Sequence, residues 1–180
     1  MTPIALSRAL TRSLPALRLT GLALLGSLAL AASAQIALPL WPVPATMQSF
    51  TVLLLGALGG SRIGAAAVLA YLVEGALGLP VFAGGASGLV ALTGPTAGFL
   101  LGFLPAAWIA GHARGGALRQ GLVLFLAHLA LFVPGLLWLM PFTGAAGAVT
   151  AGLLPFIPGT VVKTGLAWTV LRALPGKSRR

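Results

Sequence analysis

Three long stretches without a charged residue constrain the fold of this chain more than any other feature. They are residues 19–61, 75–113 and 120–162, which are 43, 39 and 43 residues long. A helix needs about 20 apolar residues to cross a bilayer, so each stretch is long enough, or nearly so, for two crossings. Only helices and closed barrels satisfy their backbone hydrogen bonds in lipid, and these runs lack the alternation of barrel strands. The pattern therefore predicts an all-α, polytopic integral membrane protein.

The composition supports a membrane protein and argues against a nucleic-acid-binding one. Only 7% of the residues are charged, against about 25% in a soluble domain, and the mean hydropathy is +1.05. Most of the surface must therefore face the lipid bilayer. The net charge of +10 does not indicate nucleic-acid binding, because the basic residues are scattered between apolar runs and form no polar face. The length suits one domain over residues 1–180.

Breaks in the apolar stretches predict a bundle of six transmembrane helices. Proline- and glycine-rich segments without charge divide the stretches at 38–44, 79–95 and 140–144, while the basic residues lie at the opposite ends. If six spans alternate, all basic clusters fall on one side, which the positive-inside rule makes the cytoplasm. Both termini are then cytoplasmic, with a basic segment 1–18 and a basic tail 173–180 on either side of a bundle over 19–172. We expect the spans at 19–38, 46–60, 63–79, 94–112, 120–140 and 155–172.

The first apolar stretch also has the features of a signal peptide. Arginines precede it, and Ala32-Ser33-Ala34 before Gln35 matches an A-x-A cleavage site. Cleavage there would leave five spans and an outer N-terminus. The apolar run continues beyond this site to Leu38, as in a true span, and so favours retention.

Glycines recur at the spacing that allows helices to pack closely in a membrane. Gly94, Gly98 and Gly102 follow one another every four residues in the expected fourth span, and Gly56 and Gly60 do so in the second. Small residues four apart lie on one helix face and let two backbones approach. We expect these rows to pack within the bundle.

Two charged residues are expected inside the membrane, where each costs roughly 2.5–3.5 kcal/mol on insertion scales. Lys163 lies nine residues before Arg172 and so about 13 Å from the inner face, while Glu74 lies twelve residues after Arg62, about 18 Å from it. The two could neutralise each other across the bundle. Alternatively, Lys163 meets an anionic ligand that enters from outside, and this is the interpretation that we prefer, with Glu74 as a possible charge partner. For Glu74 alone we expect a structural role.

A glycine-rich loop follows the expected third span. Gly84, Gly85 and Ser87 lie in it, and glycines permit positive φ and close backbone approach. The loop could present backbone groups to a polar ligand, close over a pocket or serve only as a flexible turn. Thr93 or Thr96 at its end could cap the next helix.

The sequence lacks the groups that most enzymes need. Gly176-Lys177-Ser178 ends like a Walker A motif, but Leu171 stands where its first glycine is required. A single carboxylate, the absence of cysteine and only two histidines leave no pattern for hydrolysis or a metal site. We therefore expect neither catalytic residues nor a metal, and no enzymatic activity.

Four motifs, in order and at matching spacing, resemble the biotin transporter S-component family (BioY) of energy-coupling factor transporters. They run from Pro42 to Gln48, Tyr71 to Gly85, Gly94 to Phe103 and Phe156 to Lys163, and the resemblance covers about residues 36–172. It implies six membrane helices in a bacterial plasma membrane and an extracellular-side pocket for biotin, which is a transported ligand rather than a cofactor. It also implies partnership with a transmembrane coupling protein and two ATPase subunits.

The resemblance also implies which residues bind the ligand. Lys163 matches the family's lysine in the last helix, where it could bind the biotin carboxylate. Three residues earlier the family usually has Asp, whereas this chain has Thr160, a neutral hydroxyl on the same helix face. The other residues that we assign to the ureido ring or the pocket are Gln48, Tyr71, Gly84, Gly85, Ser87 and Thr96.

Two other functions stay open. The chain could be an S component for a different vitamin, with Thr160 marking the change of ligand. It could instead be a non-transporting membrane scaffold whose glycine rows serve oligomerisation, in which case Lys163→Ala would leave function intact.

Overall fold

The computed structural model describes residues 3–174, and side chains from residue 16 onward. Residues 175–180 of the basic tail expected at 173–180 lie outside this description. So do the side chains of Arg8 and Arg12, which belong to the basic segment expected at 1–18. The elements are α1 (Pro3–Ala34), β1 (Ala37–Leu38), β2 (Ala45–Thr46), α2 (Gln48–Gly59), α3 (Ser61–Ala76), η1 (Ala83–Gly85), α4 (Gly88–Thr93), α5 (Ala97–Ala110), α6 (Ala117–Ala130), α7 (Phe132–Gly152), η2 (Leu154–Phe156) and α8 (Ile157–Ala173).

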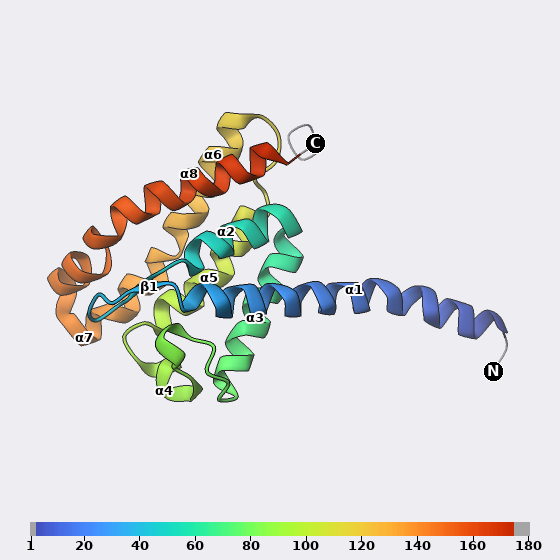
Figure 1. Ribbon diagram of the computed structural model, residues 1–180, viewed down its shortest axis with the longest axis horizontal. Coiled ribbons are helices and arrows are strands. Elements are labelled where there is room, and N and C mark those ends of the chain that lie inside the picture. Colours follow the sequence, from blue (N-terminus) through green and yellow to red (C-terminus); the bar gives the residue numbers. More distant parts are fainter. Residues whose placement is uncertain (1–2, 175–180) are drawn as a thin grey trace.

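The described chain is a helical bundle with six passes (Figure 1). These are α1, α2, α3, α5, then α6 with the first part of α7, and finally α8. Most boundaries fall within three residues of the expected spans. The first helix is the exception, because it begins at Pro3, within the expected basic segment 1–18, and ends at Ala34, four residues early. The sequence did not predict the short antiparallel pair in which Ala37 faces Thr46 and Leu38 faces Ala45.

The expected fifth span, 120–140, is one pass of the bundle that is divided into two helices at Leu131, although Leu131 keeps helical dihedrals (φ −69°, ψ −27°). α6 ends at Ala130 and α7 begins at Phe132. Pro134 lies in the first turn of α7, where its missing N–H is tolerated, but it could not have continued α6 by bonding to the Ala130 carbonyl. The break at Leu131 therefore follows from Pro134, which the sequence analysis did not use.

The expected turn at 140–144 is confirmed only at its last residue. The helix continues through Met140 to Thr143 and is interrupted at Gly144, which has φ 73° and ψ 169°. This left-handed conformation is open to glycine and strained for most other residues. The second part of α7 continues to Gly152, and the chain then passes through η2 into α8.

α1 packs along α3, and its first part extends beyond the bundle (Figure 1). Ser27, Leu30 and Ala34 are fully buried, and a Cβ on Gly26 would collide with Ala67. One face of the segment that resembles a signal peptide thus packs against α3.

Three of the five noted glycines allow close packing between helices. Gly98 faces the Pro134 carbonyl and Trp138, Gly102 faces Leu131, and Gly56 faces the Ala107 carbonyl. The other two have different places. Gly94 follows the last residue of α4, and Gly60 forms the turn between α2 and α3 with φ 84°. Packing between helices was therefore the wrong prediction for both.

Two helical stretches in the described part of the chain are long and apolar enough to cross a membrane by length and composition alone, Ala16–Ala34 and Ala117–Ala173. The apolar helices α2 and α5 have 12 and 14 residues, hence lengths of about 18 and 21 Å. They are shorter than a hydrocarbon core of about 30 Å.

Candidate functional site

A cavity of about 410 Å³ lies between the 36–49 segment, α5, α6 and the start of α8. A smaller cavity of about 250 Å³ adjoins it and shares Val43, Pro44, Thr46, Phe99 and Phe103 among its walls. Together they form a chamber whose lining is mostly apolar. The polar groups that line the larger part include Thr46, Ser49, His128, Thr160 and Lys163.

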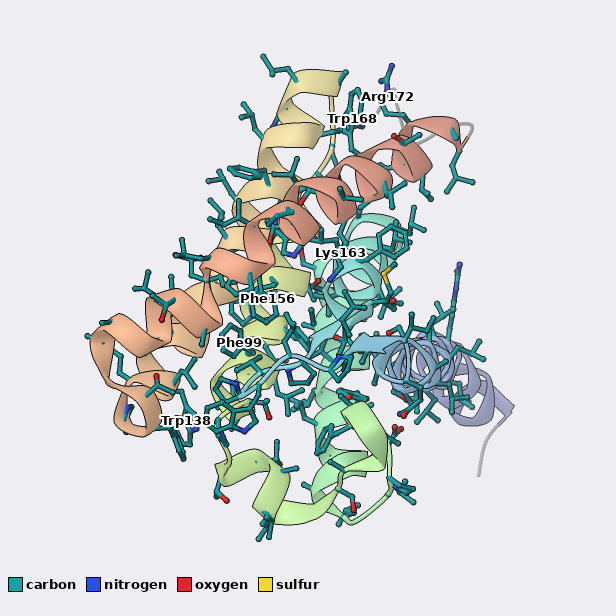
Figure 2. The ribbon with its side chains drawn as sticks, turned by 60° about the vertical axis from the view of Figure 1, so that its left-hand side comes forward. Phe99, Trp138, Phe156, Lys163, Trp168 and Arg172 are labelled. Carbon is teal, nitrogen blue, oxygen red and sulfur yellow. The ribbon has the colours of Figure 1, made fainter. Side chains whose placement is uncertain are left out.

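Lys163 points from α8 toward the start of α2 (Figure 2). Its Nζ donates a hydrogen bond to the Thr46 carbonyl at 2.6 Å and approaches Ser49 Oγ at 3.5 Å. An ammonium group has three protons, so these contacts leave one to meet a ligand. A half-buried cation is thus held at the wall of an apolar cavity, an arrangement that suits a small anionic group.

The structure does not bring Glu74 to Lys163. Glu74 Oε1 accepts a hydrogen bond of 2.8 Å from Ser27, which joins α3 to α1. The suggested charge pair is therefore wrong, because Glu74 faces α1 whereas Lys163 faces α2. The structural role expected for Glu74 alone agrees with this contact.

Thr160 lines the cavity on the same side as Lys163, and its residue is 95% buried. One turn later, Thr164 Oγ1 lies 2.8 Å from His128 Nδ1 of α6. This contact satisfies one ring nitrogen of His128, as expected of a core histidine. The residue also lines the cavity, a position that the sequence analysis did not predict.

Phenylalanines form the apolar wall next to Lys163 (Figure 2). Phe99 and Phe156 stack with ring centres 6.2 Å apart and planes at 20°, and Phe132 meets both edge-on at 6.1 and 6.3 Å. His128 stacks on Phe132 at 6.4 Å. Such rings pack well on one another and on a flat apolar ligand. In a chain this apolar, no sequence signal separates these phenylalanines from ordinary core residues.

Gln48 and Tyr71 form a buried pair beside the smaller cavity. Gln48 Nε2 donates to the Tyr71 hydroxyl at 2.6 Å, which donates to the Val81 carbonyl at 3.2 Å. Gln48 Oε1 accepts from Thr46 at 3.0 Å. Gln48 lines the cavity, whereas Tyr71 lies behind it and is fully buried. Tyr71 thus orients Gln48 and does not itself face the chamber.

The loop residues assigned to the pocket do not line either cavity. Ala83 and Ala86 line the smaller one, while Gly84, Gly85 and Ser87 lie beside them in the same loop. Gly84 and Gly85 have φ of 67° and 75°, so they shape the turn that presents the alanines. The loop is therefore next to the chamber, through residues that the sequence analysis did not name.

Thr96 also lines the smaller cavity, but neither threonine caps a helix as expected. Thr96 precedes α5 without a side-chain hydrogen bond to its first turn, and Thr93 bonds back to the Leu89 and Val90 carbonyls of α4. Because the Thr96 hydroxyl makes no capping hydrogen bond, it stays available to a ligand in the chamber.

Comparisons with known proteins agree on one family. The family model "BioY family" matches residues 7–180. A probable biotin transporter BioY of Pyrococcus horikoshii is 38% identical over 145 residues, which are 81% of this chain and 88% of that protein. The biotin transporter BioY of Rhodobacter capsulatus is 40% identical over 77% of this chain and 82% of its own. The crystal structure of the S-component for biotin from an ECF-type ABC transporter superposes with a TM-score of 0.73, at 23% identity, over 98% of this chain and 97% of that one.

Proposed function

Because the chain belongs to the BioY family, we propose that it captures biotin at the extracellular side as the S component of an energy-coupling factor transporter. The observation that carries the proposal is Lys163, a cation on the wall of a chamber lined mainly by apolar side chains. A transport function needs a site that binds the ligand but needs no catalytic group. The proposed site offers a cation and apolar walls for binding.

In the proposed complex, biotin lies with its carboxylate at Lys163 and its bicyclic ring against apolar walls. Lys163 keeps its hydrogen bond to the Thr46 carbonyl and donates a further N–H hydrogen bond to the carboxylate. The phenylalanine wall formed by Phe99, Phe132 and Phe156 covers the sulfur-containing ring and the aliphatic tail. Thr160, Gln48 and Thr96 have hydrogen-bonding groups near the chamber for the ureido ring.

We place the bundle across the plasma membrane of a bacterial cell, with six crossings and both termini in the cytoplasm. The arginines support this orientation, because Arg62, Arg114, Arg119 and Arg172 all lie at the ends of helices opposite the chamber. The short helices α2 and α5 are compatible with it, since they lie inside the bundle and local thinning of the bilayer accommodates short spans.

The family also supports a proposal about partners. A transmembrane coupling protein and two ATPase subunits would supply the energy for release of biotin into the cell. The chain itself has no Walker A motif with which to hydrolyse ATP.

Calorimetry on the purified, detergent-solubilised protein tests the proposal. We expect saturable biotin binding with one site per chain, and no binding of vitamins that lack a carboxylate, such as thiamine. A well-folded protein that does not bind biotin would contradict the proposal. If another vitamin bound instead, Thr160 would be the first position to examine.

A further inference from the structure

His128 on α6 is a buried polar residue whose ring reaches the chamber but has no part in the proposed contacts with biotin. Only 2% of the residue is exposed, and it lines the larger cavity. Its Nδ1 lies 2.8 Å from Thr164 Oγ1 of α8, and Phe132 stacks on the ring. Its Nε2 has no hydrogen-bond partner among the described residues, where only Gln120 has polar side-chain atoms that are both sealed and unpaired. The Nε2 of His128 is therefore open to the cavity.

The contact with Thr164 places a proton on this open nitrogen. Thr164 is only 7% exposed, and within the described part of the chain its hydroxyl has no partner other than His128 Nδ1. If Nδ1 carried the only ring proton, it would donate to the hydroxyl oxygen and leave the hydroxyl proton buried without an acceptor, which is costly. If the hydroxyl donates to Nδ1 instead, both groups are satisfied and the ring proton lies on Nε2. A doubly protonated ring also has a proton there, so Nε2 offers an N–H donor to the chamber in either form.

The carboxylate of biotin needs more donors than Lys163 supplies. Lys163 Nζ already donates to the Thr46 carbonyl and approaches Ser49, so one proton remains for one carboxylate oxygen. The second oxygen would lie between apolar walls without a donor, which costs free energy. His128 is near enough to serve it, because its partner Thr164 directly follows Lys163 on α8 and the Lys163 ammonium acts electrostatically on the ring.

We propose that His128 Nε2 donates a hydrogen bond to the second carboxylate oxygen of biotin, so that Lys163 and His128 hold the carboxylate between α8 and α6. This inference rests on the proposed function, because it takes biotin to lie in the chamber with its carboxylate at Lys163. Thr164 and Phe132 fix the ring in advance, so little side-chain freedom is lost on binding. A fixed donor favours an anionic acceptor over a group that itself donates, which makes His128 a specificity-determining residue for the free acid.

Calorimetry on three full-chain proteins in detergent tests this role, with biotin and with biotinol, in which an alcohol replaces the carboxylate. The proteins are the wild type, His128→Asn and His128→Gln. The amide in His128→Asn can take the place of Nδ1 and keep the contact with Thr164, but nothing replaces Nε2. The longer side chain in His128→Gln can place an NH₂ donor near the position of Nε2, which makes it the matched control.

We expect His128→Asn to weaken the binding of biotin by roughly 10-fold, as for a lost hydrogen bond to a charged group. His128→Gln should stay within about 3-fold of the wild type, because it keeps a donor. The binding of biotinol should change by less than about 2-fold in both variants, because its alcohol lacks the second oxygen.

Unchanged binding of biotin by His128→Asn would overturn the proposal. Equal losses for biotin and biotinol would do so as well, since they would place His128 against the ureido ring or in the packing of α6 on α8. An equal loss in His128→Gln and His128→Asn would also overturn it, because the donor would then not matter. Partial misfolding of a variant lowers the number of sites and not the affinity of the folded fraction, so it imitates none of these results.

The wild-type titration separates this inference from the proposed function. A wild type that does not bind biotin would contradict the proposed function and this inference with it. A wild type that binds biotin, beside an unaffected His128→Asn, would contradict only the role of His128.

Discussion

The two halves of the bundle are built from different side chains. Around Lys163 the walls are phenylalanine rings, which pack on one another and leave a chamber. Toward the arginine-rich end the core consists of alanines and leucines, with Leu53, Leu124 and Leu171 almost fully buried. Small residues let the helices approach and fill the space between them, whereas large rings hold them apart. The first half can admit a ligand, and the second can hold the bundle together.

The comparison of the two halves predicts the largest loss of stability for a substitution at Leu124, which is fully buried in the alanine- and leucine-rich half. Leu124→Ala should lower the free energy of unfolding by about 2–5 kcal/mol, because it removes apolar contacts and leaves a cavity. Titration with SDS measures the loss. Biotin affinity of the folded fraction should stay unchanged, and a fall in affinity would show that the two halves are coupled.

Gly98→Ala should cost about 1–3 kcal/mol of stability, because its Cβ would collide with the Pro134 carbonyl and Trp138. Gly165 on α8 is the matched control, since a Cβ there has no neighbour within 4 Å. Gly165→Ala should be neutral or stabilise by up to about 1 kcal/mol through higher helix propensity. Equal destabilisation by both substitutions in an SDS titration would refute close packing at Gly98.

Gln120 is a fully buried polar residue in the half of the bundle whose core is otherwise made of alanines and leucines. Its residue is fully buried, and its Nε2 and Oε1 have no hydrogen-bond partner within the described chain. An unsatisfied buried amide costs roughly 1–3 kcal/mol, so Gln120→Leu should raise the thermal midpoint in detergent and leave biotin affinity unaltered. A lower midpoint would indicate that Gln120 has a partner, such as a buried water.

Phe156→Leu should lower stability less than Leu124→Ala or Gly98→Ala, because Phe156 lies at the edge of the ring cluster and the substitution keeps an apolar side chain. Loss of the stacked ring should weaken biotin binding by roughly 3- to 10-fold, which corresponds to 0.5–1.5 kcal/mol. Calorimetry measures both the affinity and the heat. Unchanged affinity would mean that the ligand does not contact this wall.

Much of this fold could be predicted from where charges are absent. Charge-free stretches and the proline–glycine breaks located six helical passes, because a membrane requires length and apolarity above all. The break at Leu131 was missed, since Pro134 acts on the carbonyl four residues earlier and interrupts a run that is apolar throughout. Gly60 was assigned to packing because spacing alone does not distinguish a helical glycine from one that forms a turn.

The site was harder to predict than the fold. Lys163 could be identified because a charge inside an apolar run is costly and therefore informative. Ser49 and Thr46 became apparent only when α8 was seen against the start of α2, more than a hundred residues away. Gly84, Gly85 and Ser87 were chosen for their backbone freedom, but this freedom shapes a turn that presents Ala83 and Ala86 instead.

The central claim is that Lys163 binds the carboxylate of biotin, and a cycle of two proteins and two ligands tests it most directly. Wild type and Lys163→Ala would each be titrated calorimetrically with biotin and with biotin amide, which lacks the charge. We predict that Lys163→Ala weakens the binding of biotin by roughly 10- to 100-fold, as expected for a lost charge-assisted hydrogen bond. The same substitution should weaken the binding of biotin amide far less. Equal losses for both ligands would contradict the claim and place Lys163 against another part of biotin.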